Sequence, residues 1–124
     1  MPKNLIVIKR DGKQTAPPME QLQADRYFSN VVDNSLHANV KQSLNQAFDG
    51  LGKATAGYLF DGNPIIHASS GKEGTEKCVS IFYYVLGETI YTVAMGRHVT
   101  SSSYTLNHYG QVSGDFKEGA KITL

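Results

Sequence analysis

The segment that most constrains the fold is KCVSIFYYVLGETIYTVAMG, residues 77–96, where two runs dense in β-branched and aromatic residues meet at Gly87-Glu88. Residues of these types favour strands, and glycine in the first position of a two-residue turn suits a type II′ hairpin. We therefore predict a tight antiparallel hairpin over residues 78–95. Because apolar residues occupy both faces of its strands, the pair should be central in a sheet and covered on one side.

Two amphipathic segments upstream could provide that cover. Apolar residues recur at helical spacing from Met19 to about Val32, which predicts a first helix. A second helix should be capped by Asp33, Asn34 or Ser35 and end at the sequence DGLG, residues 49–52. Its apolar stripe is formed by Leu36, Val40, Leu44, Ala47, Phe48 and Leu51.

Further strands are predicted on both sides of the helical region. The apolar run from Leu5 to Ile8 closes with Asp11-Gly12, a turn signal that marks a first strand. Two β-prone pieces flank the turn sequence Asp61-Gly62-Asn63-Pro64. The predicted fold is α+β, with an N-terminal strand and two antiparallel helices packed on a twisted antiparallel sheet of four or more strands.

Length and composition agree with one domain. The chain has 124 residues, of which 40% are hydrophobic and 19% charged, as expected for a globular protein with its own core. We expect a single domain over residues 1–124, with a core at about 4–106 and a terminal hairpin or tail at 107–124. We find no apolar run near the ~20 residues that span a bilayer and no leader peptide, so we expect a cytoplasmic site of action and no membrane partner.

The stretch GRHVTSSSYTL, residues 96–106, gathers polar side chains directly after the hairpin. We expect the strand pattern to stop at Gly96 and this stretch to be a polar loop or the lip of a site. RNA cleavage without a metal needs a proton acceptor, a proton donor and cations on the phosphate. The residues of suitable type are His67, Lys72, Lys77, Arg97, His98, Tyr104 and His108.

Other chemistries find less support in the sequence. His37, His67, His98 and His108 have none of the spacings typical of zinc ligands, and Cys78 is the only cysteine, expected to be a buried strand residue. The segment SSGKEGTEK, residues 69–77, lacks the spacing of a phosphate-binding loop and is interpreted as a connection between strands. The sequence therefore predicts no metal and no cofactor. The net charge of +1 says little about partners.

The order of elements and the motif VAMGRHVTSSSY resemble the RelE/ParE superfamily of bacterial toxins, within the wider group of barnase-like, EndoU-type, colicin-type and contact-dependent-inhibition nuclease domains. The match covers residues 4–105. In that family a glycine, a basic pair and a later tyrosine follow the last core strand. The resemblance implies that Arg97 or His98 contacts or protonates RNA and that Tyr104 acts in catalysis or stacks on a base.

We therefore expect an endoribonuclease toxin that inhibits growth or translation by metal-independent acid–base chemistry. His98 and His67 are the expected proton-transfer residues, with His108 as a substitute for His67, and Tyr104 positions the base. The residues expected to bind phosphate or RNA are Arg97, Lys72, Lys77, His108 and Tyr84. The RNA would be tRNA or ribosome-bound mRNA, and an antitoxin would neutralise a cytoplasmic toxin, whereas an immunity protein would neutralise a delivered effector.

Two alternatives stay open at this point. The tyrosines of the central hairpin suit protein recognition as well as RNA stacking, so the chain could be a non-catalytic binding module such as an immunity or antitoxin-like protein. A small-ligand binder with a pocket between helices and sheet is the third possibility, without a specific residue to support it.

Overall fold

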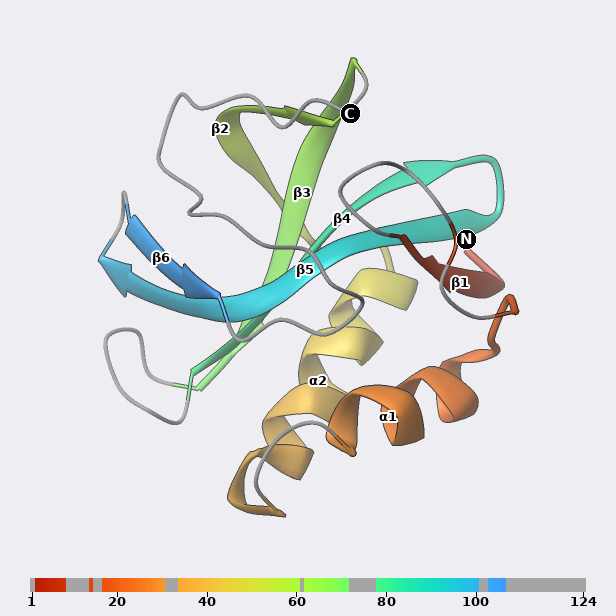
Figure 1. Cartoon of the computed structure of the whole chain (residues 1–124), viewed down its shortest axis with the longest axis vertical. Helices are drawn as coiled ribbons and strands as arrows, with labels where there is room; N and C mark the ends of the chain where they lie inside the picture. The colour runs from red at the N-terminus through yellow and green to blue at the C-terminus, as the bar shows by residue number, and fades with distance from the viewer. Residues whose placement is uncertain are drawn as a thin grey trace.

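The computed structural model describes residues 2–8, 14, 17–30, 34–60, 62–71, 78–100 and 103–106, with the backbone alone at 56–58, 60, 97–100 and 103–106. Two helices lie on one side of an open sheet (Figure 1). The elements in chain order are β1 Asn4–Val7, α1 Gln21–Ser29, the short 3-10 helix η1 Asn34–Leu36, α2 His37–Phe48, β2 Lys53–Phe60, β3 Asn63–Ser70, β4 Val79–Leu86, β5 Thr89–Thr100 and β6 Ser103–Leu106.

The sheet has the strand order β1-β5-β4-β3-β2, and β6 pairs with β5. The predicted α+β architecture is confirmed, although the sheet is mixed because β1 runs parallel to β5 while all other pairs are antiparallel. β1 pairs with the start of β5, at Thr89, and β6 pairs with its end, from Gly96. One long strand therefore carries two short partners on the same edge.

The hairpin predicted over residues 78–95 and the turn predicted at residues 61–64 both join paired strands, whereas the terminal hairpin or tail expected at 107–124 lies outside the described residues. Gly87 has φ +61 and joins β4 to β5, so the hairpin predicted over residues 78–95 is confirmed. Gly62, with φ +80, stands in the turn between β2 and β3. The expectation that strand structure ends at Gly96 is wrong, because β5 continues to Thr100 and β6 pairs back on it. β-Branched residues in the polar stretch, such as Val99 and Thr105, favour this extension.

The helices are shorter than their apolar patterns suggest. α1 begins beside Glu20, whose backbone N–H donates to Gln23 Oε1 at 2.9 Å. α2 begins after η1 with Leu36 at the N-cap and no side-chain cap, so Asn34 and Ser35 do not cap it, and Asp33 lies outside the described residues. The predicted stripe is buried except for Leu36, which is half-buried, and Leu51, which follows the helix and is 65% exposed.

Apolar residues are buried on both faces of the sheet. On the helix side, residues of β4 such as Ile81 and Tyr83 pack in one core with α1 and α2. A second cluster on the other side contains Ile8, Ile65, Phe82, Tyr84, Val93 and Ala94. The prediction that β4 and β5 are central strands is therefore confirmed.

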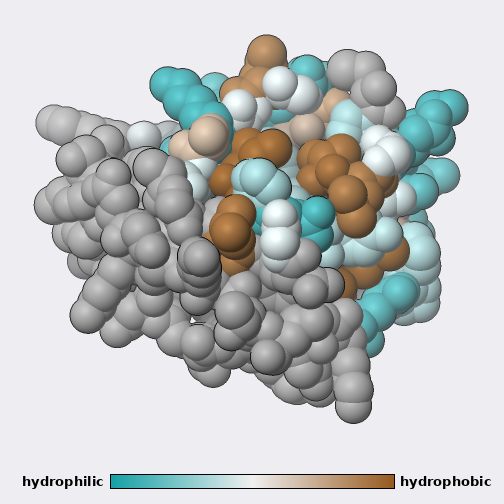
Figure 2. Space-filling model, turned by 90° about the horizontal axis from the view of Figure 1, so that it is seen from above, coloured by the Kyte–Doolittle hydropathy of each residue, from teal (hydrophilic) through white to brown (hydrophobic). Residues whose placement is uncertain are grey.

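The surface in Figure 2 shows brown hydrophobic groups separated by white and teal residues on the face seen from above. Three large apolar side chains among the described residues are well exposed, namely Leu22, Leu51 and Leu86. None of the helices in the described part of the chain is long and apolar enough to cross a membrane.

Candidate functional site

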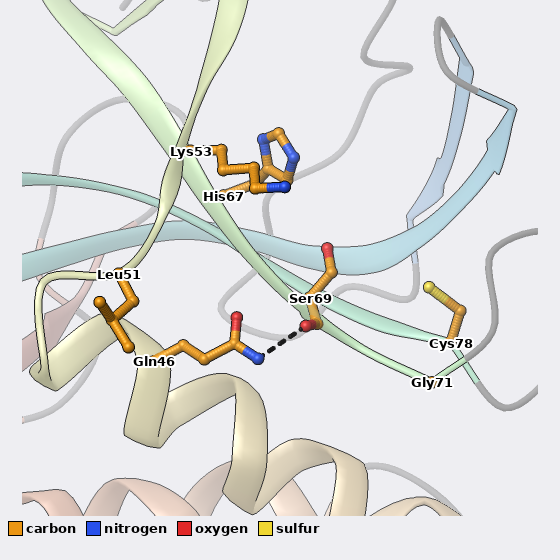
Figure 3. Close-up of a pocket in the computed structure, with 7 residues that line it drawn as sticks. All are labelled: Gln46, Leu51, Lys53, His67, Ser69, Gly71 and Cys78. Atoms are coloured by element: carbon orange, nitrogen blue, oxygen red, sulfur yellow. Dashed lines mark hydrogen bonds between the residues drawn. The ribbon is translucent and has the colours of Figure 1, made fainter.

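The site is built around a cross-strand pair at the edge of the sheet. Lys53, the first residue of β2, pairs with His67 on β3. Directly opposed residues of antiparallel strands place their side chains on the same face, and Figure 3 shows the Lys53 side chain beside the imidazole ring. A cationic side chain thus lies next to a group suited to proton transfer near neutral pH.

A hydroxyl group holds the imidazole of His67. Thr55 Oγ1 lies 2.7 Å from His67 Nδ1, and Thr55 is 4% exposed. The Phe82 ring lies beside the imidazole, with centroids 6.1 Å apart and planes tilted by 38°. Because Nδ1 is engaged by Thr55, an exchange of protons with a substrate would use Nε2. This arrangement fixes ring orientation in the manner of a positioned general base.

Further polar groups follow along the same edge. Ser69 Oγ and Ser80 Oγ are 2.6 Å apart across β3 and β4, and Cys78 Sγ lies 4.0 Å from Ser80 Oγ. Gln46, near the end of α2, donates from Nε2 to the backbone carbonyl of Ser69 at 3.0 Å. The Gln46 bond ties α2 to β3 at a position beyond the start of β2.

These groups surround a cavity of about 440 Å³. Figure 3 shows its lining, with α2 below and the β2–β3 edge above. The lining residues are Gln46, Leu51, Lys53, His67, Ser69, Gly71 and Cys78. Its volume lies within the range of small-molecule sites, about 300–1,000 Å³. The buried thiol expected at Cys78 is present, and it lines this cavity.

Residues of the polar stretch pair with one another on β5 and β6, at the opposite edge of the sheet from β2. His98 and Tyr104 are direct partners in the β5–β6 pair, and Arg97 pairs with Thr105. The β5–β6 pairing therefore places Tyr104 opposite His98, the residue next to Arg97 on β5. Sequence analysis could not predict this register, because it expected the stretch to be irregular.

The structure does not bring His67 close to His98. His67 pairs with Phe82 and Phe82 with Ala94, so β4 separates the two histidines and His98 lies four residues farther along β5. With a rise of about 3.3 Å per residue and about 4.8 Å between strands, the two backbone positions are about 16 Å apart. One scissile phosphate would therefore not be shared by these two imidazoles.

Of the remaining predicted site residues, the structure describes Tyr84 but not the others. Lys72, Lys77 and His108 lie outside the described residues. Tyr84 is 8% exposed, and its ring stacks on that of Tyr91, its cross-strand partner, with centroids 5.0 Å apart and planes within 6°. This stack occupies one face of the Tyr84 ring within the second apolar cluster.

Lys53, Thr55 and Gln46 were not among the site residues predicted from the sequence. The pairing of Lys53 with His67 could not be predicted, because the β2–β3 register shifts between Ala54 and Leu59. Phe60 pairs with Asn63, so an unbroken hairpin would place Ala56 opposite His67. The glycine before Lys53 and the turn at Gly62 predict a strand there, but they do not reveal this shift.

Among the described residues, no group of three or more histidine, cysteine, aspartate or glutamate side chains is arranged to hold a metal ion. Comparisons with protein-family models, with curated proteins and with solved structures found no match for this chain.

Proposed function

We propose that this protein is a metal-independent endoribonuclease whose reacting phosphate binds between His67 and Lys53. The observation that carries the proposal is the orientation of His67 by Thr55 beside Lys53 in the lining of a cavity. Positioned imidazole and ammonium groups are the parts that cleavage through the 2′-hydroxyl needs. The resemblance of the element order to ribonuclease toxins supports the same class.

In this reaction His67 Nε2 takes the proton of the 2′-hydroxyl as O2′ attacks phosphorus. The bond from phosphorus to O5′ breaks, which gives a 2′,3′-cyclic phosphate and a 5′-hydroxyl. The Lys53 ammonium stabilises the charge on the phosphate oxygens and donates the proton that the leaving O5′ takes. This reaction needs no oxidant, reductant or cofactor.

The β5–β6 pair serves this proposal as the RNA-binding edge. Because His98 lies about 16 Å from His67, with Arg97 next to it on β5 and Tyr104 opposite it on β6, these residues suit contacts with nucleotides beyond the cleaved bond. An enzyme of this kind inhibits growth when it is free, so an antitoxin or immunity protein that covers this edge is the expected partner.

The test is incubation of the purified protein with total bacterial RNA, with and without EDTA, followed by a denaturing gel. Discrete fragments should form in EDTA and carry 2′,3′-cyclic phosphate ends. His67→Ala should lower the rate by about 10²- to 10⁴-fold, the usual contribution of a general acid or base. His37→Ala and Lys41→Ala, on α2 and away from this cavity, are the matched controls for His67→Ala and Lys53→Ala.

Intact RNA from a folded sample, tested also with ribosomes, would contradict the proposal and favour the non-catalytic binding module. Inducible expression separates the two classes in cells, because a nuclease arrests growth and an immunity-like protein does not. The tyrosine-rich hairpin gives the binding module limited support, because Tyr83 is 1% exposed and Tyr84 is stacked on Tyr91.

A further inference from the structure

The side chain of Gln46 is held in one orientation at the α2 side of the cavity. Its partner, the Ser69 carbonyl, only accepts hydrogen bonds, so the amide atom 3.0 Å away must be Nε2. Figure 3 shows Oε1 pointing up from α2 into the space between Leu51 and Ser69. Within the described residues, Oε1 accepts no hydrogen bond, so an acceptor faces the cavity.

This orientation follows from where β2 begins. Lys53 is its first residue and pairs with His67, so β2 does not extend along β3 as far as Ser69. The Ser69 carbonyl is therefore left for a side chain of α2, and Gln46 reaches it. The hydrogen bond to the Ser69 carbonyl therefore sets the direction in which Gln46 Oε1 points.

An apolar surface lies beside this acceptor. Leu51 is 65% exposed and lines the same cavity, which continues to His67 and Lys53. Ligand sites commonly combine apolar walls with a few fixed polar groups. Leu51 can contact the face of a nucleobase while its phosphate lies near Lys53, so the two ends of the cavity suit the two ends of one nucleotide.

We infer that Gln46 makes this site selective for bases that carry an exocyclic amino group, namely adenine, cytosine and guanine, over uracil. The inference rests on the ribonuclease function proposed above. Gln46 Oε1 accepts a hydrogen bond from the amino group. Uracil has no amino group, and the one donor on its ring, N3–H, lies between two carbonyl oxygens that repel this acceptor. A fixed hydrogen-bonding group discriminates because a mismatched ligand leaves it unpaired.

The test is a titration of the full chain with the four nucleoside 3′-monophosphates, followed by NMR. The three amino-bearing nucleotides should bind about tenfold more tightly than uridine 3′-monophosphate, the effect of about one hydrogen bond. Gln46→Met should remove that difference. The matched control is Gln42→Met, one turn earlier on α2, which loses a bond to Ser70 (2.9 Å) but does not line the cavity.

A modified ligand tests the same point without changing the protein. Purine riboside 3′-monophosphate, which lacks the amino group of adenosine, should bind as weakly as the uridine nucleotide. Equal binding of all four nucleotides, with shifts at Lys53 and His67, would overturn the selectivity and leave the phosphate site standing. If none of the four nucleotides shifted Lys53 or His67, the proposed function itself would be contradicted.

Discussion

The hydroxyl of Tyr83 lies in the space that a side chain on Gly52 would need. A Cβ atom on Gly52 would overlap this hydroxyl oxygen and lie 2.6 Å from Ile66 Cγ2. Such separations do not occur without movement of one of the groups. Glycine at this position therefore lets the chain cross Tyr83 just before Lys53 and so helps to bring Lys53 opposite His67.

Gly52→Ala should lower the free energy of unfolding by about 1–3 kcal/mol, the usual cost of forcing extra atoms into packed surroundings. Urea unfolding measures the change. Tyr83→Phe removes the overlapping oxygen and should recover part of the loss in the double variant, with Ile66 Cγ2 and the ring carbon Cζ, 3.0 Å from the new Cβ, accounting for the remainder. Gly50→Ala is the control, because its cost comes from φ +74 with open space around the new Cβ and should not depend on Tyr83. Strict additivity of Gly52→Ala and Tyr83→Phe would contradict this explanation.

Burial of Tyr83 predicts a loss of stability in alkali. Desolvation raises the pKa of its hydroxyl from 10.0 to about 12. Above pH 10 the unfolded chain releases this proton while the folded protein keeps it, so the folded state binds more protons and stability falls as pH rises toward 12. Below pH 10 both states are protonated and the contribution is constant. Urea unfolding across this window should show a shallower decline for Tyr83→Phe than for the parent chain, and identical slopes would refute the assignment.

Ser43 joins the middle of α2 to the sheet by a buried hydrogen bond. Its hydroxyl donates to the Val79 carbonyl at 3.0 Å, and the residue is fully buried. Ser43→Ala should lower the free energy of unfolding by about 1 kcal/mol because the carbonyl loses this donor. Ser35→Ala, at an exposed position in η1, should change stability by less than about 0.5 kcal/mol. Equal effects of the two variants in thermal or urea unfolding would show that the buried bond contributes little.

The fold was largely predictable because its signals are local. The glycine turn at Gly87, the strand patterns around it and the apolar stripe of α2 each depend on neighbouring residues. The parallel pairing of β1 with β5 was not predictable, because it joins segments more than 80 residues apart through contacts that leave no local pattern.

The site was less accessible to sequence analysis for the same reason. His67 is proposed from its chemistry alone, but Lys53 becomes its partner only through the register shift in β2. Gln46 belongs to a helix and was hidden among polar residues of α2 until its bond to Ser69 was seen. The strand extension through Arg97 and His98 was missed because serine and arginine are weak strand signals.

The β5–β6 edge can be tested separately from the cavity. His98 lies about 16 Å from His67, and Tyr104 pairs with it one strand farther away. The double change His98→Ala with Tyr104→Phe should therefore weaken RNA binding, seen as a raised KM, and leave kcat within about threefold, as expected for the loss of uniform binding. A fall in kcat comparable to that of His67→Ala would instead place the chemistry at this edge. An unchanged KM and kcat would remove the edge from the site altogether.

Thr55 should act as a positioning residue for His67. Thr55→Val keeps the shape of this buried side chain but removes the hydroxyl 2.7 Å from Nδ1, so the imidazole loses the bond that holds its ring orientation. RNA cleavage should fall by about tenfold, the equivalent of about one hydrogen bond, while Thr55→Ser retains most of the rate. The ¹⁵N shift of Nδ1 should report the lost hydrogen bond in Thr55→Val but not in Thr55→Ser, a readout that a general loss of stability would not produce. If Thr55→Val left both the rate and the ¹⁵N shifts unchanged, the hydroxyl would not orient His67, and the proposed role of this cavity in catalysis would lose its main structural support.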